Sequence, residues 1–387
     1  MSAKQYGAKL LEEVEEQSLE QFLADIRHAA RPQPKNVLGV PGLDKLLEIF
    51  RFRAQPAGRQ PGWPSPTAVS TALGDQVDEL NDHEHASTNI DGHEEFAQIS
   101  KPRLATIELT SRKSASGKTM LLHYLSALSI LPRDLGGKES TIVYIDNDGR
   151  FSAARLLQMM QHHIQTRPAD IPETRVKQTA MEALNHAHIF RPQSSAQLIS
   201  ILDSLPTYLL DRSQHLSIHR SLSLIIIDSA TAFYWQDRFD QDMARLESPG
   251  VSGGQSKASE IIDRLKALQE RFECCVVFST TPISPPAKRP DGFHPTAASG
   301  PTSPFLTPWT SYATLTLTLS RTSVPQFPPQ MSLEECLRDA DKRFKAVRNT
   351  TFVADVDWSA NQAARVRGTT GEEGFRFRIG EMGFEAV

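Results

Sequence analysis

The sequence predicts an α/β protein in which a mostly parallel sheet is covered by helices on both faces. Short, almost wholly apolar runs alternate along the chain with longer stretches of helical periodicity, which is the pattern of parallel strands joined by crossover helices. Three of these runs lead into an acidic residue or a phosphate-type loop, which places polar side chains at one edge of the sheet. The last segment, FRFRIGEMGFEAV, predicts a closing β-hairpin around Gly380 to Gly383.

The individual elements follow from these runs in chain order. Strands are expected at residues 104–110, 141–146, 188–190, 222–228, 274–280 and 313–319. Helices between them are expected near residues 117–131, 151–164, 175–187, 195–211 and 257–272. Apolar residues at helical spacing add one or two amphipathic helices at residues 8–28.

Composition divides the chain into three parts. Residues 1–50 are expected to form an N-terminal amphipathic helix and a linker, and residues 102–387 the main α/β domain. Residues 51–101 form an acidic, proline-rich insert, which we expect to be disordered because it cannot bury enough apolar area to offset its ordering entropy. Two flexible loops are expected within the main domain, at residues 236–257 and 282–308, and the second of these holds eight prolines.

The composition also excludes several classes of protein. The 387-residue chain is 39% hydrophobic and 23% charged, which is ordinary for a globular protein. Its net charge of -4 argues against a protein that coats nucleic acid through overall positive charge. The three cysteines form neither a disulfide framework nor a zinc pattern. Because the sequence has no run of about 18 apolar residues and no apolar h-region, we expect a protein that is neither secreted nor membrane-spanning.

The stretch SRKSASGKT carries the strongest functional signal. It follows an expected strand and precedes an expected helix, as a phosphate-binding loop does. In such a loop Lys118 contacts the phosphates, Thr119 offers its hydroxyl to Mg²⁺, and Gly117 lets the backbone approach closely. The usual G-x-x-x-x-G-K-[ST] pattern would place its first glycine at position 112, but this chain has Arg112 there. Arginine enters the tight turn at this position less easily than glycine. The competing interpretation is a serine-rich helix cap. The nucleotide-binding candidates are Arg112, Lys113, Ser114, Ala115, Ser116, Gly117, Lys118 and Thr119.

Two acidic residues near other strand ends support this assignment. Asp228 ends the run LSLIIID, where it would hold a Mg²⁺-bound water beside Thr119. Asp148 follows the run TIVYID and is the catalytic candidate, as the residue that would position an attacking water. Because ligands of such sheets bind at the carboxyl ends of the strands, we expect these residues to meet there. The alternatives are a strand-end aspartate that caps the next turn and a loop acid without a catalytic role.

These motifs, in this order, resemble a known family. The chain is similar to the RecA-type ATPase core of the eukaryotic recombinase paralogues, and DSATAFYWQDR is the most specific match. The similarity spans roughly residues 101–387 plus a weaker N-terminal helix. It implies a RecA-like P-loop ATPase core with a C-terminal β-hairpin. The supporting matches are GLDKLLE, GKT, YIDNDGRFSAARL, LIIIDSATAFYW and VVFSTT.

The resemblance also implies a function. It indicates a nuclear, ATP-binding subunit of a recombinase-paralogue complex, acting in homologous-recombination repair of double-strand breaks and damaged replication forks. The implied cofactors are ATP and Mg²⁺, with Lys118 at the phosphates, Thr119 at the metal, and Asp228 as the Walker-B acid. The implied partners are a D-type recombinase paralogue, other recombinase paralogues, and single-stranded or branched DNA reached through the complex.

Departures from the family pattern bear on hydrolysis. Besides Arg112, Asp148 falls where recombinases carry a catalytic glutamate, whose side chain is one methylene longer. Pro282 falls where they carry a glutamine that senses the γ-phosphate, and a proline side chain cannot hydrogen-bond. We therefore expect nucleotide binding with little turnover by the chain alone. Two alternatives stay open, an active DNA-stimulated ATPase and a nucleotide-free recombinase-like scaffold.

Any direct DNA contact would use basic residues of the two expected loops, which leave the sheet edge where recombinases hold single strands. Because these residues are few, binding would be weak and strongly salt-dependent. The alternative is that they are solvated loop charges. The candidates are Arg238, Arg245, Lys257, Lys288 and Arg289.

Overall fold

The computed structural model describes most of the main domain and one helix that precedes it. The described residues are 38–52, 104–167, 171–247, 255–282, 307–324, 328, 330–358 and 374–386. The expected helices at residues 8–28, the insert beyond Phe52, and Lys288 and Arg289 lie outside these residues. No described helix has both the length and the apolar character needed to cross a bilayer.

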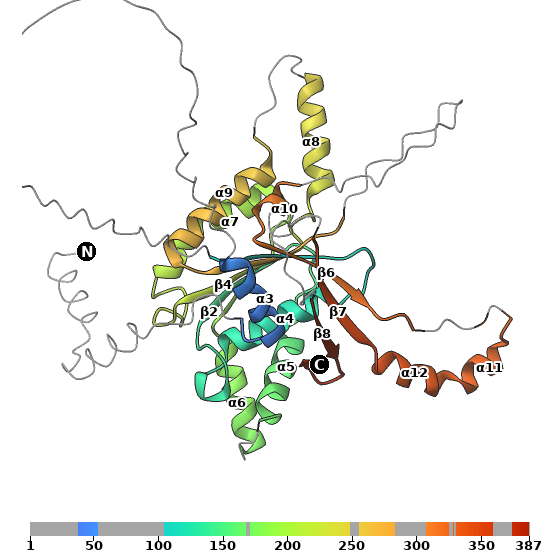
Figure 1. The fold of residues 1–387 in the computed structure, drawn as a ribbon. Helices are drawn as coiled ribbons and strands as arrows, with labels where there is room; N and C mark the ends of the chain where they lie inside the picture. The colour runs from blue at the N-terminus through green and yellow to red at the C-terminus, as the bar shows by residue number, and fades with distance from the viewer. Residues whose placement is uncertain are drawn as a thin grey trace, which may run out of the picture.

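A single sheet runs through the described part of the chain (Figure 1). Its order is β3-β2-β4-β5-β1-β6-β7-β8-β9. The pairs from β3 to β6 are parallel, and those from β6 to β9 are antiparallel. The mostly parallel α/β fold is therefore confirmed. The strands are β1 (Thr106–Thr110), β2 (Thr141–Asp146), β3 (Ala187–Phe190), β4 (Leu222–Asp228), β5 (Cys275–Ser279), β6 (Leu315–Arg321), β7 (Thr351–Val356), β8 (Gly374–Ile379) and β9 (Phe384–Ala386).

Helices cover both faces of this sheet, because successive strand residues point to opposite sides. Tyr144 of β2 packs in the core formed with α3, α4, α5 and α6, whereas its neighbour Val143 packs in the core formed with α7 and α9. The helices are α3 (Pro41–Phe52), α4 (Lys118–Ile130), α5 (Ala153–Gln165), α6 (Glu173–Leu184), α7 (Ser195–Leu210), α8 (Tyr234–Glu247), α9 (Lys257–Phe272), α10 (Pro308–Tyr312), α11 (Leu333–Arg338) and α12 (Ala340–Arg348), with a 3₁₀ turn at Arg133–Leu135.

The expected C-terminal hairpin is present, and a strand absent from the expected elements precedes it. β8 and β9 pair antiparallel, and the Gly380 amide donates to the Gly383 carbonyl at 2.8 Å. β7 pairs with both β6 and β8. Its sequence, TFVADV, buries residues on alternate positions, which is a weaker signal than the continuous apolar runs of the parallel strands.

The segment directly before the insert packs in the core of the main domain, and its helix ends at Phe52 rather than at the expected boundary, residue 50. Helix α3 runs to Phe52, and Leu43, Leu46 and Leu47 are buried in the same cluster as β1, β2 and α4. Gly42 lies so close to β8 that a Cβ there would stand 2.5 Å from the Phe375 Cβ. The spacing of the leucines indicates an amphipathic helix, but only the folded chain shows which surface its apolar face covers.

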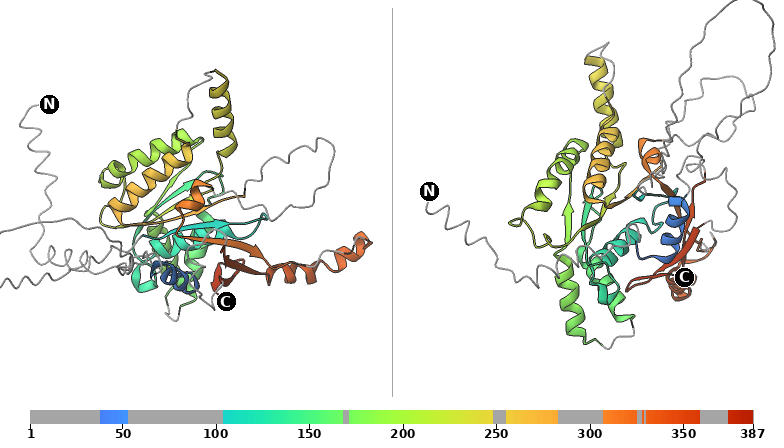
Figure 2. Two further views of the ribbon diagram at one scale, coloured as in Figure 1. Left: turned by 45° about the horizontal axis from the view of Figure 1, so that its top comes forward. Right: turned by 60° about the vertical axis from the view of Figure 1, so that its left-hand side comes forward.

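The loop expected at residues 236–257 is also wrong over its first half, because residues 236–247 form most of helix α8. Charged side chains support the helix, since Asp242 accepts from Arg238 at 3.3 Å and from Arg245 at 3.2 Å. Helix α8 buries none of its residues and stands out from the body in both views of Figure 2. Because no residue of this helix faces the core, its sequence was interpreted as a loop.

The packing of α3 leads to a stability prediction. Leu43→Ala should lower the free energy of unfolding by about 2–5 kcal/mol, because Leu43 is fully buried and its truncation leaves a cavity. Leu216→Ala is the matched control, since this leucine is 73% exposed, and its effect should stay within about 0.5 kcal/mol. Chemical denaturation of the full chain measures both. Equal midpoints for the two variants would contradict the placement of α3 in the core.

Candidate nucleotide-binding site

The predicted phosphate-binding loop lines a cavity of about 340 Å³ at the carboxyl ends of the parallel strands. All eight predicted loop residues face this cavity, together with Asp148 and Asp228. The expectation that these groups meet at one sheet edge is met by the register of β2 and β4, which pairs Asp146 with Asp228. The lining residues are Ser111 to Met120, Asp148, Arg150, Asp228, Ser229, Ser279 and Thr281.

The phosphate-binding loop closes although Arg112 replaces glycine, because the backbone at Arg112 is not in the left-handed conformation that favours glycine. Gly117 caps α4 with φ 91°, and a Cβ there would approach Phe352 and Ile379 to 3.0 Å, so any other residue would be strained. The described non-glycine residues with positive φ include Ala115, at 55°, but not Arg112. Arg112 is instead exposed, and Ser111 before it is buried. The arginine therefore lies at the rim of the cavity, where it adds positive charge.

Lys118 lies half-buried in the loop without a charged partner among the described residues. Its ammonium donates to the Ser111 hydroxyl, which in turn donates to the Lys113 carbonyl at 3.1 Å. Burial lowers the pKa of Lys118, and the nearby Asp228 charge opposes that effect. A phosphate oxygen would supply the missing counter-charge, because it is an anionic acceptor that fits a loop of this kind.

Asp228 is buried and accepts from hydroxyl groups of three different elements. Its Oδ2 accepts from the Thr119 hydroxyl at 2.8 Å and from the Tyr144 hydroxyl at 3.2 Å. Its Oδ1 accepts from the Ser279 hydroxyl. Thr119 and Asp228 thus bring two oxygen ligands together beside the phosphate-binding loop. This donor set fits Mg²⁺, which takes one or two protein oxygens and completes its shell with phosphates and water.

The backbone of Asp228 also holds the loop that carries Asp148. The Asp228 carbonyl accepts from the amides of Asn147 at 2.7 Å and Asp148 at 3.2 Å, and the Asn147 side chain donates to the Ser229 carbonyl at 2.8 Å. The Asp148 carboxylate lies 3.7 Å from the Arg150 guanidinium. Burial raises the pKa of Asp148, although Arg150 opposes the shift. Asp148 therefore faces the cavity as a carboxylate of increased basicity.

The basic residues of the second half of the domain lie away from this cavity. Lys257 is the first residue of α9 and pairs with Asp237 and Asp240 at 3.1 Å each, while Arg238 and Arg245 share Asp242. These carboxylates neutralise the three described candidates for DNA contact. Because they are already paired, their contribution to an attractive DNA surface is reduced.

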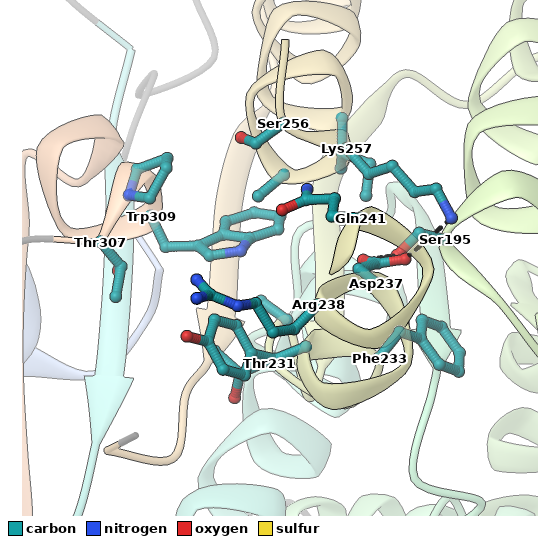
Figure 3. A pocket seen from close by; sticks show the side chains of 15 residues that line it. Ser195, Thr231, Phe233, Asp237, Arg238, Gln241, Ser256, Lys257, Thr307 and Trp309 are labelled. Carbon is teal, nitrogen blue, oxygen red and sulfur yellow. Dashed lines mark hydrogen bonds and ion pairs between the residues drawn. The ribbon is translucent and has the colours of Figure 1, made fainter. Parts of the chain in front are cut away.

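Two of these cations border a second cavity, of about 170 Å³. Figure 3 shows Arg238 next to the indole of Trp309, with Lys257 directed towards Asp237. The Ser195 hydroxyl also donates to Asp237, at 2.6 Å. The start of α8 is thereby tied to α7 and α9. Pro282, the residue expected at the sensor position, is exposed.

Several site residues were missed by reasoning from the sequence. Tyr144 and Ser279 donate to Asp228, Ser111 accepts from Lys118, and Arg150 pairs with Asp148. Tyr144 and Ser279 lie inside apolar runs that were interpreted only as strands. Their positions near strand ends were a usable signal, but the adjacency of Ser279 and Asp228 depends on β4 and β5 being neighbours.

Comparisons with known proteins agree with this geometry. The sequence model of the Rad51 family matches residues 104–304, which is more than half of the chain. The mouse (Mus musculus) DNA repair protein XRCC2 is 32% identical over 163 residues, which cover 39% of this chain and 48% of the mouse protein. The DNA repair and recombination protein RadA of Methanocorpusculum labreanum is 32% identical over 120 residues, which cover 31% of this chain and 34% of that protein.

The chain thus spans about half the length of the mouse relative and about a third of the archaeal one. The match to the family includes the phosphate-binding loop, the Asp148 loop and Asp228, which meet in the larger cavity. The predicted resemblance to eukaryotic RecA-type recombinase paralogues of the XRCC2 kind is confirmed. The chain therefore belongs to the Rad51 family.

Proposed function

We propose that this protein is an ATP-binding subunit of a recombinase-paralogue complex that acts in homologous-recombination repair of double-strand breaks and damaged forks. The observation that carries the proposal is the cavity in which Lys118, Thr119 and Asp228 converge. Lys118 would contact the phosphates, and Thr119 and Asp228 would hold Mg²⁺ directly and through water. When bound, Mg·ATP supplies a phosphate chain, and its negative charge is balanced by the metal and by the loop.

Nucleotide holding, rather than rapid turnover, is the activity that these residues support best. Asp148 faces the cavity, but its carboxylate is one methylene shorter than the family glutamate, and Pro282 offers no side-chain hydrogen bond. A DNA-stimulated ATPase is the second candidate, favoured by the raised pKa of Asp148, which suits a group that accepts a proton. Steady phosphate release above that of a Lys118 variant would establish this second activity.

Apolar surface that is exposed in the described part of the chain supports a role as a subunit. Helices α11 and α12 form an arm between β6 and β7, seen at the right of Figure 1, and neither helix buries a residue. Leu333, Leu337, Phe344 and Val347 are between 40% and 76% exposed. Together with Ala340 they repeat at alternating intervals of four and three residues, which is the spacing of a helix-packing seam. Such a seam fits a helix of another protein, and we assign it to the D-type recombinase paralogue.

The setting proposed for the complex is the nucleus. The relatives are described as proteins of DNA repair and of DNA repair and recombination. Single-stranded or branched DNA would reach the complex largely through its other subunits, because the described basic candidates of this chain are engaged in ion pairs.

Nucleotide binding should depend on Lys118. Lys118→Ala removes one charge-assisted phosphate contact, and the expected loss is about 1.5–3 kcal/mol, or about 10- to 150-fold in affinity. Titration with a fluorescent ATP analogue and Mg²⁺ measures it. Lys266→Ala is the control, because Lys266 is exposed on α9 and its ion pair in the described part of the chain is with Asp263. Equal affinity in wild type and Lys118→Ala would refute the phosphate-loop assignment.

Partner recovery should depend on the arm and not on the nucleotide site. We expect Leu337→Glu combined with Phe344→Glu to lower copurification of the D-type paralogue at least about tenfold, because two charges would be buried in the seam. Lys118→Ala should leave recovery unchanged. Leu216→Glu is the control for an exposed leucine off the arm. Full recovery with the double variant would place the partner elsewhere on the chain.

A further inference from the structure

His123 connects the phosphate-binding helix to the loop that carries Asp148. It lies in α4, four residues after Thr119, and is completely buried. One ring nitrogen, Nδ1, lies 2.7 Å from the Thr119 carbonyl, and the other, Nε2, lies 3.2 Å from the Ser152 amide. The imidazole therefore bridges the residue proposed to bind Mg²⁺ and the end of the Asp148 loop.

The bridge requires a neutral imidazole of one tautomer. The Ser152 amide can only donate, so Nε2 must be the unprotonated acceptor. The proton then lies on Nδ1, which donates to the Thr119 carbonyl. Burial lowers the pKa of His123, in keeping with a neutral ring, although the Asp228 and Asp146 charges oppose the shift. Both nitrogens are thus used, and each contact belongs to a different structural element.

Aromatic contacts hold the ring in this orientation. Phe151 stacks on His123 at a centroid distance of 5.1 Å, and Tyr144 meets its edge at 5.8 Å. Tyr144 also donates to Asp228, which accepts from Thr119. The contacts therefore form a closed circuit that passes from Thr119 through His123, the aromatic rings and Asp228 back to Thr119.

The other hydrogen bonds to the Asp148 loop come from residues at strand ends and not from helix α4. The Asp146 carboxylate accepts from the amides of Arg150 at 2.8 Å and Phe151 at 3.2 Å, and it pairs with Arg191 at 3.0 Å. The Asp228 carbonyl holds Asn147 and Asp148. Asp146 and Asp228 end strands β2 and β4, and Arg191 directly follows β3. Among the described residues, His123 makes the hydrogen bond that joins the loop backbone to helix α4.

We propose that His123 is a positioning residue that couples the Asp148 loop to the Mg²⁺·nucleotide site through its Nε2 contact with Ser152. The proposal rests on the proposed nucleotide-binding function. If Thr119 held the metal, its carbonyl would fix the His123 ring through Nδ1, and the ring would pass this constraint to the Ser152 amide through Nε2. Asp148 is thereby held at the cavity when nucleotide is bound.

Two substitutions separate the two halves of the bridge. In His123→Gln the side-chain oxygen reaches the position of Nε2 and keeps an acceptor for Ser152. In His123→Asn the side-chain amide lies at the position of Nδ1 and keeps a donor for Thr119, but nothing reaches Ser152. Both variants lose the aromatic ring, so each controls for that loss in the other.

The first readout needs no nucleotide. Amide hydrogen exchange at Ser152 in the full chain should stay near the wild-type rate in His123→Gln and rise at least about fivefold in His123→Asn, as expected for one lost hydrogen bond. The Gly136 amide, which donates to the Arg133 carbonyl, should exchange equally in all three proteins. Equal exchange at Ser152 in the two variants would overturn the proposed contact.

The second readout is affinity for an ATP analogue with Mg²⁺. His123→Asn should bind at least about fivefold more weakly than His123→Gln. Equal affinities in the two variants, with normal binding by the wild type, would overturn the coupling alone. Absence of binding by the wild type would instead refute the proposed function, and the coupling with it.

A measurement on the wild type keeps the proposal testable if either variant fails to fold. Adding the ATP analogue and Mg²⁺ should slow exchange of the Ser152 amide at least about fivefold and leave Gly136 unchanged. Slower exchange at Ser152 supports the coupling. Unchanged exchange at Ser152 under saturating nucleotide would overturn it.

Discussion

The buried carboxylate of Asp228 is the contact on which the rest of the site depends. A charge in this position is costly unless it is hydrogen-bonded, and its donors come from α4, β2 and β5. The same residue uses its carbonyl to hold the Asp148 loop. One strand end therefore fixes the relative positions of the phosphate-binding helix, the neighbouring strands and the loop. Loss of one donor would leave part of a buried charge unsatisfied, at a cost of about 1–3 kcal/mol.

The charge balance of the cavity explains why it suits a phosphate chain. Its lining includes the cations Arg112, Lys113, Lys118 and Arg150 and the carboxylates Asp148 and Asp228. The excess of positive charge is concentrated on the phosphate-binding loop, and the carboxylates lie across from it on β4 and the β2–α5 loop. This separation favours an anion that is bridged to the carboxylates by a divalent cation. Arg112 contributes to the excess, so its presence in place of glycine changes the electrostatics more than the path of the backbone.

The helices at the periphery of the protein are stabilised by different interactions from those at its centre. Helix α8 and the α11–α12 arm bury no residue; capping and ion pairs support them, and Asp237 ties the start of α8 to α7 and α9. Ser332 and Glu335 form a capping box at the start of the arm. Short helices without a buried apolar face are marginal in water. Their apolar faces are therefore suited to becoming ordered against another molecule, whereas the candidate nucleotide site is built on strands that are already fully packed.

Local patterns in the sequence determined the parallel strands, most of the helices and the phosphate-binding loop. Apolar runs such as LSLIIID indicate strands that are buried on both faces of a sheet. The order of strand, GKT and helix is likewise a signal that lies within a few residues of the chain. The same signals predicted that Asp148 and Asp228 would meet the loop, because parallel strands share one carboxyl edge.

Only the tertiary structure decided the contacts that complete the site. Thr119 and Asp228 are 109 residues apart, and Ser279 reaches Asp228 because β5 is placed beside β4. The burial of α3, the helical state of residues 236–247 and the bridge made by His123 were likewise absent from the local pattern. Strand order, and the partners of polar side chains buried within apolar runs, depend on how the whole sheet packs. No single stretch of the sequence carries that information.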